Sequence, residues 1–480
     1  MSALFALLLL PGAADTLSVG LLADPVTLAP HRATDLVSAA VIANTCDTLV
    51  RARGHRPDAG LATTWATQDN RTWTFTLREG VAFHDGEAFD ARAVILNIDA
   101  LREAHAFPGR AHRVGPHVVT IVLDKPSAAL LATLSQPFYS MVSPRALASG
   151  QPVGTGPFRL HSARPGLVVL GAHAGYWGGA PRLQRIAFRR YPTEEALVAA
   201  LLAGEVDVTA AIGQDRIASL GSAAELRLDS QTGLNISFLS VNGERPPFDD
   251  VRVRQALARA IDREALVQHL LGGHGEPARN PLPPSLWGYS NRTRELYLDR
   301  PSARRLLAEA GHPDGFDTTL LAVDTARPYM PDPRRLATSL RDDLAHVGIR
   351  ARLVPVSSWA EYTARGSRGD YDLMALGWQA DSTDPNDFLT ALLASEAIGA
   401  TNRSRYQSEA MDALLKRGRM ASDQPSRSRV YGEVQELFQR DMPWVPLCHV
   451  ASYTAHRKSV RDLVVGPTGV LRYERVWKSE

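Results

Sequence analysis

Two residues of opposite charge each follow a strand-like run in this sequence. Asp381 comes shortly after the run from Tyr371 to Trp378, and Arg327 comes shortly after the run from Thr318 to Val323. If both runs lie in one parallel sheet, their carboxyl ends meet at the edge where such sheets bind ligands. A carboxylate and a guanidinium at one crevice suit a zwitterion with an amine at one end and a carboxylate at the other. A short peptide is the obvious candidate.

The elements around these two residues follow the order strand, helix, strand, helix, strand. Asp332 and Pro333 are typical of a helix N-cap followed by proline at the first helical position. Apolar residues then recur at helical spacing until Gly348, which ends the predicted helix. A strand-like run over residues 350–356 and a short polar helix over residues 359–365 lead to the second run. The pattern predicts a parallel sheet.

Composition indicates a multidomain globular protein. The chain has 480 residues, which favours two or three domains, and it is 45% hydrophobic and 22% charged. The formal net charge is +2, from 53 basic and 51 acidic residues. No large field of one sign therefore indicates nucleic acid as a partner.

The start of the chain is typical of a secretory signal peptide over residues 1–14. An apolar core over residues 3–10 precedes small residues suited to cleavage. The alternative is a buried N-terminal strand or helix. The apolar core is too short to span a bilayer. A cleaved signal would place the mature protein in the periplasm.

Cysteine and histidine usage gives no support for a disulfide framework or a built-in metal site. Cys46 and Cys448 could pair, but two separate buried thiols are expected. The chain has no CxxC or HExxH spacing, and His84 lies in a polar turn where a structural role is favoured. We expect no metal and no cofactor.

The N-terminal half predicts a mixed α/β lobe. Strands are expected over residues 16–21, 73–77 and 118–122, in one run from Phe158 through Gly166 to Gly171, and over 235–241. Helices are expected over residues 36–49, over 91–101, and between Thr193 as N-cap and Gly204 as stop. The polar, proline-bearing stretch after Val241 favours a crossover between two lobes there.

Eight motifs resemble the family 5 extracellular solute-binding proteins of peptide ABC transporters, in the family's order and across nearly the whole mature chain. They are Leu61–Trp65, Trp73–Gly86, Gly154–Phe158, Pro247–Ala256, Asn280–Pro284, Trp287–Tyr289, Ala308–Gly311 and Gly377–Pro385. Each motif alone has modest specificity, whereas the ordered series is highly specific. The chain most resembles the dipeptide-binding branch of that family.

The resemblance assigns roles to Asp381, Arg327 and the loop around Thr34. The family's Gly-Trp-x-x-Asp motif falls on Gly377, Trp378 and Asp381, which implies that Asp381 captures a peptide α-amino group. The arginine before Pro-Tyr-x-Pro falls on Arg327, which implies a clamp for the free carboxylate, and Tyr329 and Trp378 can form the walls of the side-chain pocket. The loop around Thr34 is expected to contribute backbone groups from the other lobe.

The resemblance also implies the fold class: α/β, a two-lobed periplasmic-binding-protein fold of type II in its three-subdomain form, with mixed sheets and a ligand cleft between lobes. Expected boundaries are residues 15–238 for lobe I with an inserted subdomain at about 50–175, 239–450 for lobe II, and 451–480 returning to lobe I. The implied partners are a peptide ligand and the permease subunits of an ABC transporter. A monomer is expected.

Three other cargoes and one enzymatic function stay open. The second interpretation is the branch that carries nickel through an organic chelator. That branch has an arginine in a Pro-Arg-Pro-Phe setting, and this chain has Ser-Gln-Pro-Phe over residues 135–138, without the arginine. Glutathione and haem are further cargoes in the family. A secreted peptidase would need a nucleophile and base or a metal, and the sequence has no GxSxG, SxxK or HExxH pattern.

Overall fold

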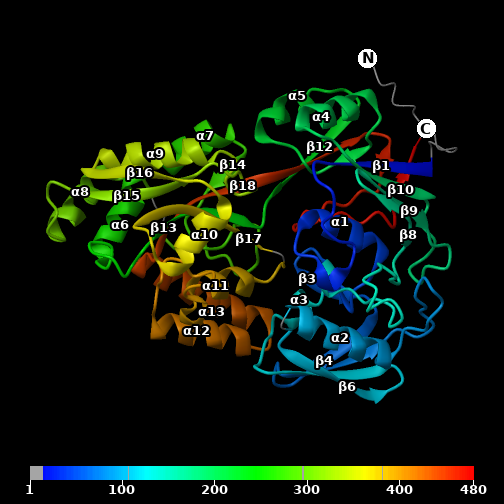
Figure 1. Ribbon diagram of the computed structural model, residues 1–480. Helices are drawn as coiled ribbons and strands as arrows, with labels where there is room; N and C mark the ends of the chain where they lie inside the picture. Colours follow the sequence, from blue (N-terminus) through cyan, green and yellow to red (C-terminus); the bar gives the residue numbers. More distant parts are fainter. Residues whose placement is uncertain (1–14, 106, 295–296, 381, 480) are drawn as a thin grey trace.

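The computed structural model describes residues 15–105, 107–294, 297–380 and 382–479. The predicted signal peptide over residues 1–14 and the predicted site residue Asp381 lie outside these ranges. Two lobes joined by a long strand make up the molecule (Figure 1).

Side-chain caps define the starts of most helices. Asp332 accepts a hydrogen bond from the Arg335 amide, and Thr193 accepts one from the Ala196 amide, as the sequence predicts. The α-helices are α1 (Leu36–Thr45), α2 (Ala91–His105), α3 (Leu130–Thr133), α4 (Glu194–Ala203), α5 (Ile217–Gly221), α6 (Val251–Ala260), α7 (Arg263–Leu271), α8 (Arg300–Glu309), α9 (Pro333–Ala345), α10 (Trp359–Arg368), α11 (Pro385–Leu393), α12 (Glu409–Met420) and α13 (Gln424–Asp441).

Strands form one large mixed sheet and smaller ones. The strands are β1 (Thr16–Leu21), β2 (Val50–Arg53), β3 (Arg56–Ala59), β4 (Ala62–Thr67), β5 (Thr72–Leu77), β6 (Gly109–Gly115), β7 (Val118–Leu123), β8 (Phe158–Arg164), β9 (Leu167–Ala172), β10 (Arg185–Arg190), β11 (Val208–Thr209), β12 (Leu226–Thr232), β13 (Asn235–Val241), β14 (Gly275–Pro277), β15 (Phe316–Val323), β16 (Ile349–Val356), β17 (Leu373–Gln379), β18 (Trp444–Arg457), β19 (Val460–Arg461) and β20 (Trp477–Lys478).

The large sheet runs through both lobes because β18 belongs to both. Its path is β16-β15-β17-β13-β18-β11-β1-β10-β9-β8, with β12 and β14 also paired to β18. The first part of β18 pairs with β13 and β14, and its last part pairs with β11 and β12. Since β12 leads directly into β13, the chain passes between the lobes twice, at residues 233–235 and again within β18.

The predicted parallel sheet is confirmed. β15 pairs in parallel with β16 along its whole length, and in parallel with β17 at Leu320 opposite Leu373. β15 and β17 therefore end at the same edge. β17 also pairs antiparallel with β13, so its last residues lie opposite the start of β13.

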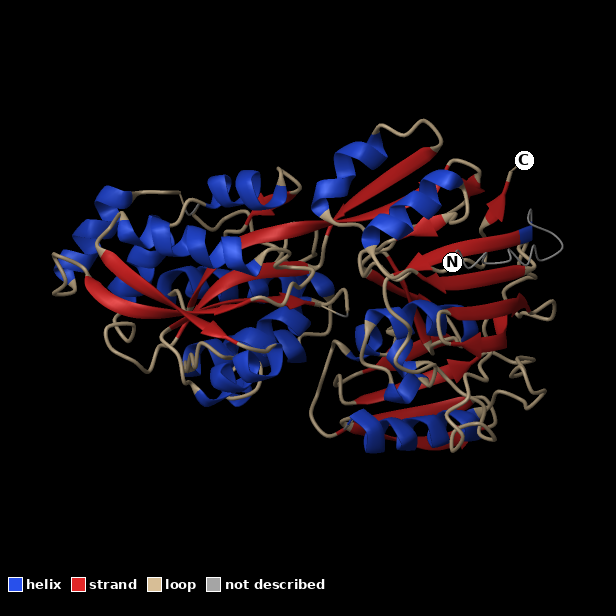
Figure 2. Cartoon of the chain, turned by 45° about the horizontal axis from the view of Figure 1, so that its top comes forward, coloured by secondary structure: helices blue, strands red, loops and turns tan. Residues whose placement is uncertain are grey.

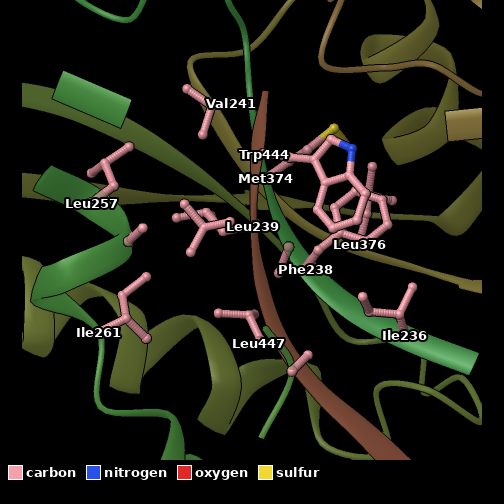
Figure 3. Close-up of a cluster of buried hydrophobic side chains, with 14 of the residues drawn as sticks. Ile236, Phe238, Leu239, Val241, Leu257, Ile261, Met374, Leu376, Trp444 and Leu447 are labelled. Atoms are coloured by element: carbon pink, nitrogen blue, oxygen red, sulfur yellow. The ribbon is translucent and has the colours of Figure 1, made fainter. Parts of the chain in front are cut away.

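One hydrophobic cluster extends from Leu234 to Val450, and we call this part of the molecule lobe II and the rest of the described chain lobe I. Side chains from β13, β17, β18 and α6 converge in it (Figure 3). The Trp444 ring lies 4.5 Å from the ring of Phe238 between centroids. Burying each such side chain stabilises the fold by about 1.5–3 kcal/mol. Figure 2 shows helices on both faces of the lobe II sheet.

Lobe I has separate clusters around its four-stranded antiparallel sheet, β4-β5-β7-β6, and around its part of the large sheet. Asp47, which is fully buried, links β2 to the C-terminal segment. Its Oδ1 lies 2.8 Å from Nη2 of both Arg51 and Arg472. Burial opposes the charge of Asp47, but the two guanidinium groups lower its pKa.

Two sequence predictions in lobe I are wrong in detail. The run from Phe158 to Gly171 is a hairpin of β8 and β9, because Gly166 adopts φ +81° at the turn. The helix predicted to reach residue 49 ends at Thr45, where Cys46 has extended backbone angles. The prediction of two separate buried thiols at Cys46 and Cys448 is confirmed. The predicted domain boundaries lie near the limits of the clusters, and the division into domains stays a prediction.

Candidate ligand-binding site

A tight turn after β15 presents Arg327 at the edge where the parallel strands end. The amide of Arg327 donates to the carbonyl of Met330 at 3.0 Å, and the amide of Met330 donates back at 2.8 Å. Pro328 restricts the second position of the turn, and Met330 is 1% exposed, which anchors the turn in the lobe II core. Arg327 therefore stands on a rigid support.

The guanidinium of Arg327 stacks on the indole of Trp359, the first residue of α10. The distance from Cζ to the ring centroid is 4.1 Å. Nε of Arg327 is buried and has no hydrogen-bond partner, and no carboxylate within the described ranges forms an ion pair with this arginine. Stacking holds the guanidinium plane and leaves its edge available to an anion.

Gly377 and Tyr329 are brought together at this edge. A Cβ atom on Gly377 would lie 2.2 Å from Cδ2 of Tyr329, so only glycine lets the phenol ring lie against β17. Trp378 follows, half-buried, with an indole Nε1 that is enclosed but has no partner. Buried donors without partners are costly, and a bound ligand can satisfy them.

The end of β17 lies at the junction between the lobes. Gln379 pairs with Asn235, the first residue of β13, and Nδ2 of Asn235 donates to the carbonyl of Val450 at 2.8 Å. His449 lies beside them, with Nδ1 2.7 Å from the Asn235 carbonyl oxygen. In Figure 1, β17 lies on the side of lobe II that faces α1 and β3 of lobe I. The arginine edge thus opens toward the other lobe.

The other predicted site residues are less closely connected. Asp381 lies outside the described residues. On either side of it, the Ala380 amide donates to the Leu234 carbonyl at 2.8 Å, and the Ser382 amide donates to Oδ2 of Asp387 at 3.1 Å. Thr34 is exposed in lobe I, just before the N-cap of α1, and no described hydrogen bond joins it to the turn of Arg327.

Sequence reasoning missed two residues next to this cluster. Trp359 was assigned only to a short polar helix, although an aromatic residue directly after a strand end is a recognisable signal. Arg403 lies in the loop before α12, and its Nη1 donates to the carbonyl of Thr363 in α10 at 2.9 Å. Burial raises the pKa of Tyr329, and the positive charges of Arg327 and Arg403 oppose that shift, which places both arginines near its phenol.

A second feature between the lobes is a cavity of about 150 Å³. Its walls come from lobe I around Asn70, Trp73 and Ser135 and from lobe II around Trp287, Asp384 and Arg427. Arg427 closes the lobe II side with two bonds of 2.7 Å to the carboxylate of Asp384. The cavity is separate from the residues around Arg327, and the protein itself neutralises its main charges.

Metal and membrane features can be assessed only over the described residues. They contain no group of three or more His, Cys, Asp or Glu side chains arranged to hold a metal ion. None of the helices described is both long and apolar enough to cross a membrane.

A two-lobed α/β protein with two strand passages and a charged, aromatic edge at the junction defines the class of solute-binding proteins that close around a ligand. The chain belongs to the bacterial extracellular solute-binding proteins, family 5, whose model matches residues 56–400. The predicted fold class, α/β with two lobes and mixed sheets, is confirmed by solved structures of such proteins.

Curated relatives include proteins with different cargoes. The chain is 30% identical to heme-binding protein A of Haemophilus influenzae, over 86% of this chain and 82% of that protein. It is also 30% identical to the dipeptide-binding protein of Escherichia coli, over 87% of this chain and 85% of the relative.

Solved structures resemble the whole described fold. HbpA2 from Haemophilus parasuis has 28% identity and a TM-score of 0.90, covering 97% of this chain and 100% of that chain. The dipeptide-binding protein of Pseudoalteromonas sp. SM9913 in complex with Met-Leu has 28% identity and a TM-score of 0.81, over the same shares of the two chains.

Proposed function

We propose that this protein is the extracytoplasmic receptor of an ABC importer, which captures di- or short oligopeptides between its lobes and delivers them to a membrane permease. The observation that carries the proposal is the guanidinium of Arg327. It is stacked on Trp359, has no carboxylate partner among the described residues, and stands where the lobe II strands end at the lobe junction.

The carboxylate end of a peptide fits this arginine. The guanidinium fork matches a carboxylate with two parallel hydrogen bonds, and each charge-assisted bond contributes about 1.5–3 kcal/mol. When lobe I closes over the edge and excludes water, an unpaired guanidinium costs several kcal/mol. A ligand without a carboxylate at this position therefore binds weakly.

The amino end is assigned to Asp381 through the Gly-Trp-x-x-Asp motif. Support comes from its neighbours, because Ala380 and Ser382 are both hydrogen-bonded at the lobe junction, close to the end of β17. Tyr329 and Trp378 supply walls for the peptide side chains, and backbone groups near Thr34 are proposed to complete the site from lobe I. The two charged groups lie at a fixed separation, so both can be satisfied only by a peptide whose termini are equally far apart. This arrangement selects short ligands.

The remaining properties follow from this role. A cleaved signal peptide over residues 1–14 delivers the protein to the periplasm, where it acts as a monomer without a catalytic step or resident cofactor. The predicted boundaries at residues 238/239 and 450/451 lie close to the two strand passages, at residues 233–235 and within β18, about which we propose that the lobes close. Relatives and neighbours named for peptides support the peptide cargo: di/tripeptide-binding protein 1 of Pseudomonas aeruginosa is 29% identical.

Haem is the second candidate cargo, because heme-binding protein A and the dipeptide-binding protein of Escherichia coli are each 30% identical to this chain. Haem propionates would also satisfy Arg327. Haem has no ammonium group for Asp381, so the peptide is favoured. A secreted peptidase is not favoured, since the family consists of solute-binding proteins.

Calorimetry on the purified protein tests the proposal. A free dipeptide is expected to bind, whereas its N-acetyl form and its C-terminal amide are expected to bind at least tenfold more weakly, since each lacks one end charge. Mass spectrometry of the ligand that copurifies with the protein identifies the cargo independently. Binding of haem with no binding of any dipeptide, or cleavage of the peptide during incubation, would contradict the peptide-receptor role.

A further inference from the structure

Arg403 reaches toward the site from a loop remote in sequence. Its backbone carbonyl accepts a hydrogen bond from the hydroxyl of Tyr371, which fixes the start of the side chain. The side chain then passes Gly366 of α10, where a Cβ atom would lie 2.8 Å from Cδ of Arg403. Glycine at position 366 leaves room for the arginine beneath the helix.

The guanidinium groups of Arg403 and Arg327 both contact α10. Nη1 of Arg403 donates to the carbonyl of Thr363, and Arg327 stacks on Trp359. Thr363 follows Trp359 by four positions, so the two residues are neighbours on one helix face, about 5–6 Å apart. Both guanidinium groups therefore contact α10, and both lie near the phenol of Tyr329.

No carboxylate of the described residues neutralises Arg403. The only described hydrogen bond of its guanidinium goes to the Thr363 carbonyl, and no carboxylate in the described part of the chain pairs with it. Burial lowers the pKa of Arg403, and three tyrosines are the only groups that oppose this shift. Arg405, two residues further on, does have a partner in Glu244. An incompletely buried cation without a counter-ion, beside a second such cation, favours an anion from outside.

We propose that Arg403 is a specificity-determining residue that selects peptides with a second carboxylate. Arg327 takes the α-carboxylate, and Arg403 takes the side-chain carboxylate of a C-terminal aspartate or glutamate. This assignment rests on the proposed peptide-binding function and names its substrate class as acidic dipeptides.

Calorimetry with Ala-Glu and Ala-Gln tests the proposal, because these dipeptides match in size and differ in one charge. The protein is expected to bind Ala-Glu at least tenfold more tightly. Arg403→Gln should remove this preference and leave the affinity for Ala-Gln within about twofold. Arg405→Gln, which removes a nearby arginine that already has a partner, is the matched control and should keep the preference.

The outcomes separate this proposal from the proposed function. Equal binding of both dipeptides by the unmodified protein overturns the role of Arg403 and leaves the peptide-receptor function in place. Binding of neither overturns both. The preference of the unmodified protein needs no variant, so it decides the question even if Arg403→Gln fails to fold. A folded Arg403→Gln protein that keeps the full preference also overturns the proposal.

Discussion

Lobe II contains two arginines that stack on tryptophan, and their surroundings differ. Arg427 lies 4.9 Å from the ring centroid of Trp287 and makes two bonds of 2.7 Å to the buried carboxylate of Asp384. Arg327 lies 4.1 Å from the ring centroid of Trp359, and no described carboxylate pairs with it. Both are held by aromatic rings, but among the described residues only Arg427 has a carboxylate that neutralises its charge.

The difference separates a structural arginine from a ligand-binding one. Asp384 caps α11 and Arg427 lies in α13, so their pair links two helices inside lobe II. Arg327 links no elements through its charge, and its preorganised fork at the lobe junction is suited to an external carboxylate. Removing the first should change stability, and removing the second should change binding.

The largest effect is expected from Asp384→Asn. The substitution keeps an acceptor for the α11 cap but leaves Arg427 buried without a counter-ion, since both side chains are 6% exposed. Breaking such a pair is expected to lower the free energy of unfolding by about 3–5 kcal/mol. Urea titration measures this loss. Asp324→Asn, which removes an exposed partner of Arg334, is the control and should change stability far less, because water and salt screen an exposed pair. Similar losses for the two variants would refute the structural role.

Arg327→Gln should weaken ligand binding and leave the free energy of unfolding almost unchanged, the reverse of Asp384→Asn. We expect dipeptide affinity to fall roughly 10- to 150-fold, the equivalent of about 1.5–3 kcal/mol from a charge-assisted bond. The free energy of unfolding without ligand should stay within about 1 kcal/mol, because no ion pair is lost. The variant should also bind free and amidated dipeptides almost equally. A stability loss like that of Asp384→Asn would place Arg327 in the structural group.

His449 extends the comparison to a buried ionisable group that is neutral in the folded protein at pH 7. Burial lowers its pKa from the ordinary value of 6.5 to about 4. The unfolded chain takes up the proton first, so the stabilising contribution is complete above pH 6.5 and is lost as pH falls toward 4. When the pH is lowered from 7 to 5, protonation of this group in the unfolded chain should lower the free energy of unfolding by about 2 kcal/mol.

Urea titrations of the unmodified protein and of His449→Asn over this pH range measure that contribution. The asparagine amide can replace the Nδ1 bond to the Asn235 carbonyl, so the variant should fold. It should lose less stability on acidification. Part of the remaining slope belongs to His84, whose pKa burial also lowers to about 4. An unchanged slope would contradict the prediction.

The smallest effect is expected from Trp359→Leu. Leucine keeps an apolar surface but removes the cation–π contact with Arg327, which is valued at about 1 kcal/mol, so dipeptide affinity should fall roughly fivefold. Calorimetry measures it, and Trp287→Leu provides the corresponding variant beside Arg427. If the latter weakened the peptide more than the former, the two arginines would have been assigned the wrong roles.

Local signals predicted the framework of the site well. The run from Asn235 to Val241 and the cap at Asp332 occur where the sequence places them, and the parallel pairing of β15 with β17 brings the turn of Arg327 to the edge expected. Alternating and helical hydrophobic patterns carry this information because each depends on neighbouring residues.

Other features depend on contacts between distant segments and leave no local pattern. One miss is local instead: Pro165 and Gly166 form a typical turn signal between β8 and β9, and the prediction of a single strand overlooked it. Arg403 reaches the site only because Gly366 makes room and Thr363 offers a carbonyl, and neither contact follows from spacing. The pairing of Asp384 with Arg427 likewise depends on how two helices pack.

The most direct test of the carboxylate clamp is a crystal structure of the protein with a bound dipeptide. We predict that the C-terminal carboxylate lies at about 2.7–2.9 Å from the guanidinium nitrogens of Arg327, with the peptide enclosed between the lobes. A peptide whose carboxylate binds elsewhere, or Arg327 paired with a carboxylate of the protein itself, would contradict the account.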